Sequence, residues 1–459
     1  MNDSVIKELV EIVGEDWTLW DLEMIEGYLY DETPKPVTPK AVEDVVIVKP
    51  KNTDEISELL KLANKKDLRV IPRGAGTGLC GAAVPTKESI LLSLERLDEI
   101  PDLDANNLTV TCEAGVTLEE LFEEIDKTGD LFFPPHPGDE GAQIGGLVVE
   151  NAGGARAVKY GVVRNHVTGI KGVLPTGEQV KFGGKVLKNN SGYDLMHLLI
   201  GSEGTLGIIT EVTLRLYPEP DKDATLIVPF ENRQDAIESV PQILRKGFIP
   251  LAIEYIEKEH IDKAAEHLGE KWPAVDGEAQ LVVIIVSQSE EELYVKAESV
   301  SRVCKENNSL EMLMAERSKE QKKILDIRSN LYSTYQTEMA EDIDIAVPPV
   351  NLGRMLKIID QVEEETGVSI PTWGHAGDGN LHLHVMMKDG EKPDNLEEVK
   401  ENLYREAINI GGVITGEHGI GKTRVKNLPL MFNKTELDLM RRVKEAFDPH
   451  SILNPDTAI

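Results

Sequence analysis

The chain has 459 residues, of which 41% are hydrophobic and 28% are charged, and its formal net charge is −32. This length predicts two or three domains, and the acidic charge argues against nucleic-acid binding, which needs a basic surface. No apolar stretch approaches the roughly 20 residues that span a bilayer, and the N-terminus lacks the basic and apolar segments of a secretion signal. Three cysteines without close spacing favour a reducing cytoplasm.

The first half of the chain combines short strands with helices, without the strict βαβ alternation of a doubly wound sheet. Residues 1–30 predict a helix, with Val5, Leu9, Val10 and Val13 on one face. Residues 134–161 are rich in glycine and proline and predict a long functional loop. Further helices are predicted at 54–63 and 118–127, and strands at 45–48, 68–71, 90–94, 108–113, 168–174, 179–182, 207–216 and 225–229.

The second half begins after a Pro-Glu-Pro-Asp stretch at 218–221, which is the expected domain boundary. A last helix is predicted at 434–447, where Asp448-Pro449 ends it. Before it, helices at 232–246, 290–307, 350–366 and 396–410 alternate with strands at 281–286, 343–346, 381–386 and 412–415.

Four of the ten histidines lie in two short stretches near the C-terminus, GHAGDGNLHLH at 374–384 and GEHG at 416–419. Imidazole and carboxylate together suit zinc, manganese or iron, and three protein ligands leave a position open for substrate. If 381–385 is a strand, His382 and His384 share one face. We expect His375 to enter from the preceding loop and Glu417 from a separate strand and loop. The alternative is a pair of satisfied histidines on a sheet face.

Glycine-rich segments upstream indicate a second site. Residues 73–81 read RGAGTGLCG, and closely spaced glycines with an arginine let backbone N–H groups approach a phosphate. Two further glycine belts, at 145–146 and 151–154, favour a large flat ligand whose pyrophosphate lies against bare backbone. A glycine-rich structural turn is the alternative.

Two nucleotide motifs match the sequence without their usual context. Residues 76–81 fit G-x-G-x-x-G, but Ala82-Ala83-Val84-Pro85 follows in place of a helix, which disfavours a nicotinamide site. Residues 416–423 fit the P-loop pattern, but Pro429 comes within two turns of the point where a helix should begin. A metal-dependent hydrolase or NTPase that uses this loop without flavin stays as an alternative function, and a non-catalytic nucleotide-binding module as a third.

Arg328 lies in a predicted helix. It is either a solvated surface residue or a group that clamps a substrate carboxylate through two hydrogen bonds.

Seven sequence blocks then occur in order along the chain. They are PRGAGTGLCGAAVP (72–85), FFPPHPG (132–138), IGGLVVENAGGARAVKYGVVR (144–164), SGYDLMHLLIGSEGTLGIITEVTLRLYP (191–218), GHAGDGNLHLH (374–384), GEHGIG (416–421) and FDPHSILNP (447–455). Together they resemble the FAD-linked D-2-hydroxyacid dehydrogenases of the vanillyl-alcohol-oxidase-type flavoprotein superfamily. This family includes D-lactate dehydrogenases and the FAD-binding subunit of glycolate oxidase, and the resemblance covers about 36–455.

The resemblance implies an α+β fold. A two-subdomain FAD-binding domain would be followed by an α+β cap domain with a mainly antiparallel sheet, and the C-terminal segment would return to the FAD domain. The expected parts are an N-terminal helical segment (1–35), the FAD-binding domain (36–218), the substrate or cap domain with the metal site (219–425) and the C-terminal segment (426–459).

The resemblance also implies residue roles. His418 would be the catalytic base, and Arg328 would bind the substrate carboxylate. His384 stands where some relatives bind substrate through an asparagine. Zinc would be held by His375, His382 and Glu417. FAD would be bound by Arg73, Gly74, Ala75, Gly76, Thr77, Gly78, Leu79, Gly81, Gly145, Gly146, Asn151, Gly153, Ile209 and Asn454.

The implied reaction is oxidation of a D-2-hydroxyacid, with D-lactate or glycolate favoured, to the 2-oxoacid, with hydride passing to flavin N5. Electrons would leave to a quinone, an iron–sulfur subunit or another carrier, because the chain has no iron–sulfur cysteine cluster. No nucleic-acid partner is expected. The expected location is cytoplasmic. A homodimer, and a peripheral position at the inner face of a membrane through a partner, are left open.

Overall fold

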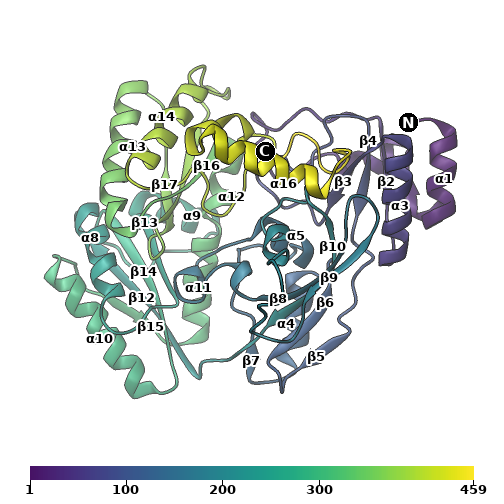
Figure 1. Cartoon of the computed structure of the whole chain (residues 1–459). Coiled ribbons are helices and arrows are strands. Elements are labelled where there is room, and N and C mark those ends of the chain that lie inside the picture. Colours follow the sequence, from purple (N-terminus) through teal and green to yellow (C-terminus); the bar gives the residue numbers. More distant parts are fainter.

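The computed structural model describes all 459 residues and has two lobes that lie side by side (Figure 1). The N-terminal lobe contains a four-stranded and a five-stranded sheet, and the C-terminal lobe contains a seven-stranded sheet. Every pairing in the seven-stranded sheet is antiparallel. The α+β prediction is therefore confirmed.

The two sheets of the N-terminal lobe share one hydrophobic core. The smaller sheet has the order β1 (Thr18–Leu19), β2 (Val45–Val48), β4 (Ser89–Ser93) and β3 (Arg69–Arg73). The larger has the order β5 (Asp102–Asp104), β6 (Thr109–Glu113), β10 (Ile208–Arg215), β8 (Val167–Val173) and β9 (Gln179–Gly183). The helices of the N-terminal lobe are α1 (Asp3–Val13), α2 (Leu22–Ile25), α3 (Thr53–Lys66), α4 (Leu118–Asp126), α5 (Ile144–Glu150), α6 (Ala157–Tyr160) and α7 (Met196–Leu199). In addition, β7 (Leu131–Phe132) pairs with β11 (Tyr217–Pro218).

The sheet of the C-terminal lobe has the order β15 (Leu313–Ala315), β12 (Lys222–Phe230), β14 (Ala279–Ser287), β13 (Ala252–Glu257), β17 (Thr372–His375), β18 (Asn380–Met386) and β16 (Met339–Ala346). Its helices are α8 (Arg233–Leu244), α9 (Lys258–His267), α10 (Glu290–Glu306), α11 (Ser318–Ser329), α12 (Leu331–Tyr335), α13 (Leu352–Thr366) and α14 (Leu396–Asn409), followed by α15 (Leu428–Met431) and α16 (Lys434–Phe447). No helix of the chain combines the length and the apolar character that crossing a membrane requires.

Three sequence predictions of secondary structure are wrong. The helix expected at 1–30 ends at Val13, because Gly14 adopts φ +93° and Thr18 then enters β1. The expected loop at 134–161 contains α5 and α6. The expected strand at 412–415 is only an isolated bridge, in which Val413 N–H donates to Ala346 O at 2.8 Å.

The C-terminal segment returns to the N-terminal lobe, as the resemblance implies. After α16, the chain pairs with β3, where Val70 N–H donates to Ile452 O and Asn454 N–H donates to Val70 O, both at 2.8 Å. Lys444 on α16 also donates to Thr205 O at 2.7 Å. In Figure 1 the yellow α16 lies over the N-terminal lobe. These bonds fix the end of the chain beside the glycine-rich loop that follows β3.

One testable consequence concerns Leu383 on β18, which is 0% exposed and packs in the main core of the C-terminal lobe. Leu383→Ala should lower the free energy of unfolding by roughly 2–5 kcal/mol, because it leaves a cavity behind the strand. The matched control Leu439→Ala lies on α16 and is 54% exposed, and it should change stability by less than about 0.5 kcal/mol. Equal losses in urea unfolding would contradict this account of the core.

Candidate active site between the two lobes

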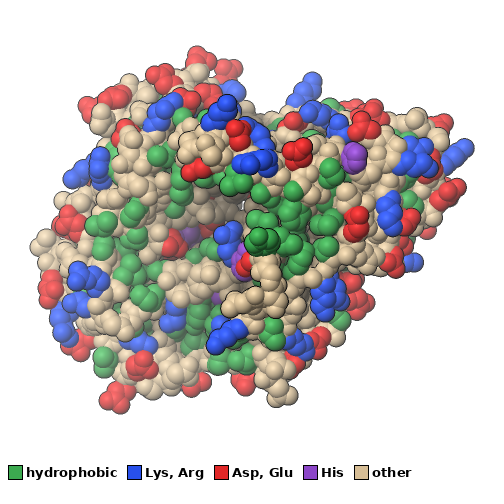
Figure 2. All heavy atoms as spheres, viewed as in Figure 1, with side chains coloured by type: hydrophobic (Ala, Val, Ile, Leu, Met, Phe, Trp, Pro, Cys, Tyr) green, Lys and Arg blue, Asp and Glu red, His purple; other side chains and the backbone are tan.

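A large cavity opens beside the glycine-rich loop of the N-terminal lobe. It holds about 1280 Å³ of empty space, its open mouth included. Figure 2 shows the hollow between the lobes, with purple histidine side chains inside it. The predicted cofactor residues on its wall are Arg73, Gly74, Ala75, Gly76, Thr77, Gly78, Leu79, Gly145, Gly146, Gly153, Ile209 and Asn454.

Two predicted cofactor residues do not line this cavity. Gly81, with φ +73°, packs so closely on Pro39 that a Cβ would meet that ring at 2.7 Å. Asn151 ends α5 in the left-handed conformation, and its side chain accepts the N–H of Arg164 at 3.0 Å. Both residues shape the loops around the cavity from outside.

The cavity wall has polar atoms that fit a dinucleotide. Nη1 of Arg73, Oδ2 of Asp31 and Oε1 of Gln143 are buried without any hydrogen-bond partner, and all three residues line the cavity. Buried polar groups rarely lack partners. Space is also open in front of Gly146, where a Cβ would meet nothing within 4 Å. A cationic guanidinium, bare backbone and free polar atoms suit the pyrophosphate and flat ring of FAD.

The histidine motif lies on the cavity-side face of β18. Leu381, Leu383 and Val385 point into the core, so His382 and His384 occupy the opposite face. The neighbouring strand β16 brings two buried aspartates to the same place, because the register pairs Asp344 with His382 and Asp342 with His384. His375 does not come from a loop as expected, since it is the last residue of β17.

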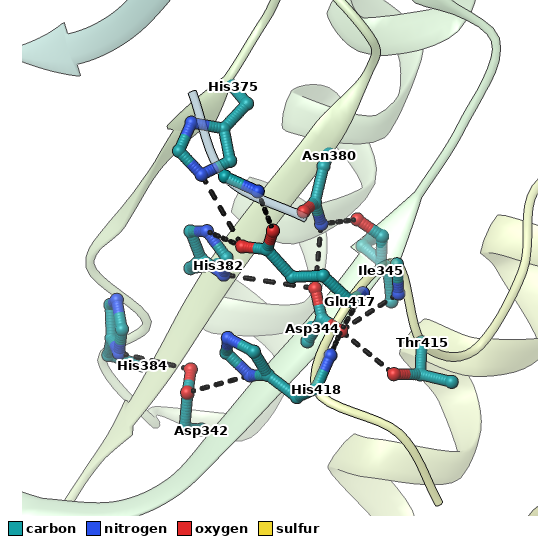
Figure 3. Close-up of polar contacts among 12 residues, drawn as sticks. Asp342, Asp344, Ile345, His375, Asn380, His382, His384, Thr415, Glu417 and His418 are labelled. Carbon is teal, nitrogen blue, oxygen red and sulfur yellow. Dashed lines mark hydrogen bonds and ion pairs between the residues drawn. The ribbon is translucent and has the colours of Figure 1, made fainter. Parts of the chain in front are cut away.

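Asp344 fixes the segment that carries Glu417 and His418. Its Oδ2 accepts the backbone N–H groups of Gly416, Glu417 and His418 at 2.8 Å each, and the hydroxyl of Thr415 at 2.8 Å (Figure 3). Its Oδ1 accepts from the Asn380 amide at 2.7 Å. Although burial opposes ionisation, His418 and His382 hold the pKa of Asp344 far below its usual range. The carboxylate thus fixes the segment that directly follows the expected strand at 412–415.

This arrangement does not suit the P-loop alternative. No helix begins at Gly421, and the N–H groups of 416–418 already donate to Asp344. Those of Ile420 and Gly421 donate to the carboxylate of Glu203 at 2.9 and 2.6 Å. The backbone N–H groups that a P-loop offers to phosphate are therefore already bonded to the carboxylates of Asp344 and Glu203.

His375, His382 and Glu417 form a compact donor set. The Nε2 atoms of both histidines lie 3.4 Å from Oε1 of Glu417, whose carboxylate points between the two rings (Figure 3). This separation is longer than an ordinary hydrogen bond. It matches the edge of a tetrahedron, about 3.3 Å, around an ion with zinc-type bond lengths. Their donor atoms lie within 4.8 Å of one another. The donor set therefore fits a divalent cation.

Glu254 on β13 supports this set and was not predicted. Its Oε1 lies 2.8 Å from Nδ1 of His375, which leaves Nε2 directed at Glu417. Its Oε2 accepts from Nε of Arg328 at 2.7 Å, so Arg328 on α11 lies beside the donor set. Although burial opposes the charge, Glu254 and Glu417 raise the pKa of His375 to about 10. A bound cation would take the place of that proton.

His418 faces the cavity, and its other ring nitrogen is held by Asp342. The distance from His418 Nδ1 to Asp342 Oδ2 is 3.2 Å, and the ring stacks on His382 at 5.0 Å between centroids. Burial opposes protonation, but Asp344 and Asp342 raise the pKa of His418 to about 9. By contrast, burial and the charge of His418 lower the pKa of His382 to about 4. The pKa values of the two neighbouring histidines are therefore shifted in opposite directions.

His384 is not on the cavity wall, where the resemblance placed a substrate contact. It is 1% exposed, lies on the far side of Asp342 with 3.3 Å between Nδ1 and Oδ1, and stacks on Trp373 with centroids 4.0 Å apart. Burial lowers its pKa to about 3. In this position it neighbours Asp342, which in turn holds His418.

The loop with Glu417 and His418 also contacts the N-terminal lobe. Gly154 N–H donates to Oε2 of Glu417 at 2.5 Å. Sγ of Cys80 lies 3.1 Å from the carbonyl oxygen of His418. The donor set and the FAD cavity are therefore held in direct contact.

Comparisons with known proteins agree with this geometry. A family described as FAD binding domain matches residues 45–183, and one described as FAD linked oxidases, C-terminal domain, matches residues 219–458. The chain belongs to the FAD-linked oxidases. This FAD-linked oxidase is 41% identical to a D-lactate dehydrogenase of Archaeoglobus fulgidus, over 95% of this chain and 96% of the relative. It is 37% identical to a D-lactate dehydrogenase of Anaerostipes hadrus, over 99% and 97%.

Further relatives place this FAD-linked oxidase in the same group. Glycolate oxidase subunit GlcD of Bacillus subtilis is 34% identical, over 93% of this chain and 91% of the relative. The fold matches 4-ethylphenol oxidase from Gulosibacter chungangensis with a TM-score of 0.79 at 17% identity, covering 99% of this chain and 96% of that one. The protein is thus an FAD-dependent oxidoreductase of the D-lactate dehydrogenase and glycolate oxidase type.

Asp344→Asn tests whether this carboxylate holds the loop. An amide would turn its NH₂ group toward other donors, so we expect the free energy of unfolding to fall by about 1–3 kcal/mol. Hydrogen exchange at the amides of 416–418 should become roughly tenfold faster or more, since about 1.4 kcal/mol corresponds to a factor of ten. The control Asp438→Asn lies on the exposed face of α16, and it should change neither quantity. Unchanged protection of 416–418 in Asp344→Asn would contradict this role.

Proposed function

We propose that this FAD-linked oxidase oxidises a D-2-hydroxyacid, with D-lactate or glycolate favoured, to the 2-oxoacid with the help of a divalent metal ion. The observation that carries the proposal is that Glu417 and His418 line the FAD cavity, while His375 and His382 lie directly behind them, each with Nε2 3.4 Å from Oε1 of Glu417. We also propose the division into 1–35, 36–218, 219–425 and 426–459, with the flavin in the second part and the metal ligands in the third.

FAD, when bound, supplies the acceptor for the hydride that leaves C2 of the substrate, at its N5 atom. The residues of this chain determine where that ring lies. Arg73 and the 74–79 loop offer a cation and backbone to the pyrophosphate, and Gly146 leaves open space for the flat ring. Gly145 and Gly153 allow close packing on Ala114 and Glu417. Glu417 and His418 belong to the same wall, so the ring would lie within reach of both side chains.

His375, His382 and Glu417 would hold the metal ion, and two imidazoles with one carboxylate favour zinc. Such an ion supplies a Lewis acid that lowers the pKa of the substrate hydroxyl. The hydroxyl proton passes to Nε2 of His418, while Asp342 keeps the proton on Nδ1 and orients the ring. The raised pKa of His418 belongs to the protein without a cation, and a positive ion beside the ring lowers it.

Arg328 binds the substrate carboxylate in this proposal. Glu254 occupies its Nε and Nη2 atoms, and Nη1 has no partner in the protein. The remaining N–H groups can therefore bind an anionic substrate beside His375, whose Nδ1 lies 3.4 Å from Nη2 of Arg328. This contact would orient C2 toward the flavin and select the hydroxyacid face.

The electrons must leave the flavin for a separate acceptor. Cys80, Cys112 and Cys304 are buried and unpaired, so they offer no cluster. We propose a quinone, an iron–sulfur subunit or another carrier as the acceptor. We also propose a cytoplasmic location. A homodimer, and attachment to the inner face of a membrane through a partner, are both compatible with this proposal.

A pair of neighbouring substitutions tests the assigned roles. Glu417→Gln should lose the metal, because an amide is a poor ligand for zinc. His418→Asn should retain metal and flavin, yet reduction of the flavin by D-lactate should slow by roughly a hundredfold or more, the usual cost of losing a general base. The measurements are metal content by mass spectrometry and flavin absorbance in anaerobic rapid mixing.

The matched control is His267→Asn on the exposed end of α9, which should alter neither metal content nor rate. Loss of metal in His418→Asn with full retention in Glu417→Gln would reverse the two assignments. A normal rate of flavin reduction in both variants would move the active site elsewhere.

A further inference from the structure

Glu150 is a carboxyl group on the cavity wall for which the reaction above has no use. It is the last residue of α5 and lines the FAD cavity. Its side chain makes no hydrogen bond and no ion pair with any protein group, although most acidic side chains of the active site have several. A charged group on such a wall would be expected to have a partner.

A second carboxyl group lies next to it. A Cβ built on Gly419 would be 2.7 Å from Oε2 of Glu150 and 3.3 Å from Oε1 of Glu203, so both side chains approach the same point. Glu203 accepts two backbone N–H groups, from Ile420 and Gly421. Hydrogen bonds to a carboxylate favour its charged form, and two neighbouring carboxylates do not ionise together readily. Glu203 is therefore the member that carries the charge.

Glu150 is then the member that keeps a proton. Burial and the charge of Glu203 raise the pKa of Glu150 well above its usual range, which agrees with the geometry. A neutral carboxyl is a donor through its O–H group. No hydrogen bond joins this carboxyl to Glu203 or to any other protein group, so the donor is free to meet a ligand in the cavity that both residues line.

The position of Glu150 along the cavity indicates which part of FAD it would contact. Arg73 and the 74–79 loop attract the pyrophosphate, so the redox ring lies toward Glu417 and His418, where substrate must be oxidised. Glu150 contacts Gly419, the residue directly after His418. This places Glu150 next to the segment that carries Glu417 and His418, so we take the ring as the part of the ligand that its O–H group meets.

We propose that Glu150 is a neutral carboxylic acid that donates a hydrogen bond to the isoalloxazine ring of bound FAD and so raises its reduction potential. The ring gains negative charge on reduction, so a donor stabilises the reduced form more than the oxidised form. An ionised carboxylate in the same place would have the opposite effect. This inference rests on the proposed function only in that it takes FAD to occupy this cavity.

The test compares Glu150→Gln, which keeps a donor, with Glu150→Leu, which has none. The control is Glu298→Gln, on the exposed face of α10. Flavin content is measured first, and the potential is then found by equilibration with a reference dye, without any hydroxyacid. Glu150→Leu should shift the reduction equilibrium about tenfold toward oxidised flavin, or roughly 30 mV for a two-electron couple. Glu150→Gln and the control should stay close to the wild type.

Infrared difference spectra of reduced minus oxidised protein give a second readout. The wild type should show a protonated carboxyl band that Glu150→Gln removes, and this holds even if Glu150→Leu fails to retain flavin. A potential that Glu150→Leu leaves unchanged or raises, a shift in Glu150→Gln as large as in Glu150→Leu, or a wild type without the band would each overturn the proposal. Because the potential is measured against a reference dye without hydroxyacid, failure here differs from failure of D-lactate to reduce the flavin.

Discussion

Two buried aspartates opposite two histidines form the constraint on which the rest of the active site depends. Carboxylates without partners are costly inside a protein, and Asp342 and Asp344 on β16 are both nearly inaccessible. The antiparallel register places them against His384 and His382, but those rings do not satisfy all four oxygens. The 415–418 loop satisfies Asp344, on which its N–H groups converge, and it places the ring of His418 3.2 Å from Oδ2 of Asp342. Charge burial in the sheet thus determines where His418 lies.

The same loop joins the two lobes. On one side it donates to Asp344, and on the other Glu417 accepts from Gly154 while Glu203 accepts from Ile420 and Gly421. A loop held from both sides keeps its side chains in one geometry, which the proposed hydride transfer from C2 and proton transfer from its hydroxyl both require. The C-terminal segment adds a second connection, where Asn454 joins β3. The FAD cavity and the donor set are therefore one site.

Local patterns in the sequence predict much of this structure, and long-range pairings explain what they miss. The alternation in LHLHV correctly predicts which face of β18 carries the histidines, and β2 and α16 begin and end where propensity and caps indicate. The roles of Asp344 and Glu254 could not be predicted, because their histidine partners His382 and His375 lie 38 and 121 residues away along the chain. Local sequence patterns do not specify the register between such distant strands. The strand expected at 412–415 is reduced to one bridge with Ala346, because the chain directly after it turns its N–H groups to the side chain of Asp344.

The most direct test is an anaerobic titration of the purified protein with D-lactate, followed at the flavin absorbance, before and after removal of metal by a chelator. Our account predicts that metal-replete protein is bleached, that chelated protein keeps its FAD but stays oxidised, and that added zinc restores bleaching. Complete bleaching of metal-free protein at the original rate would contradict the central claim that the histidine and glutamate donor set acts together with the flavin.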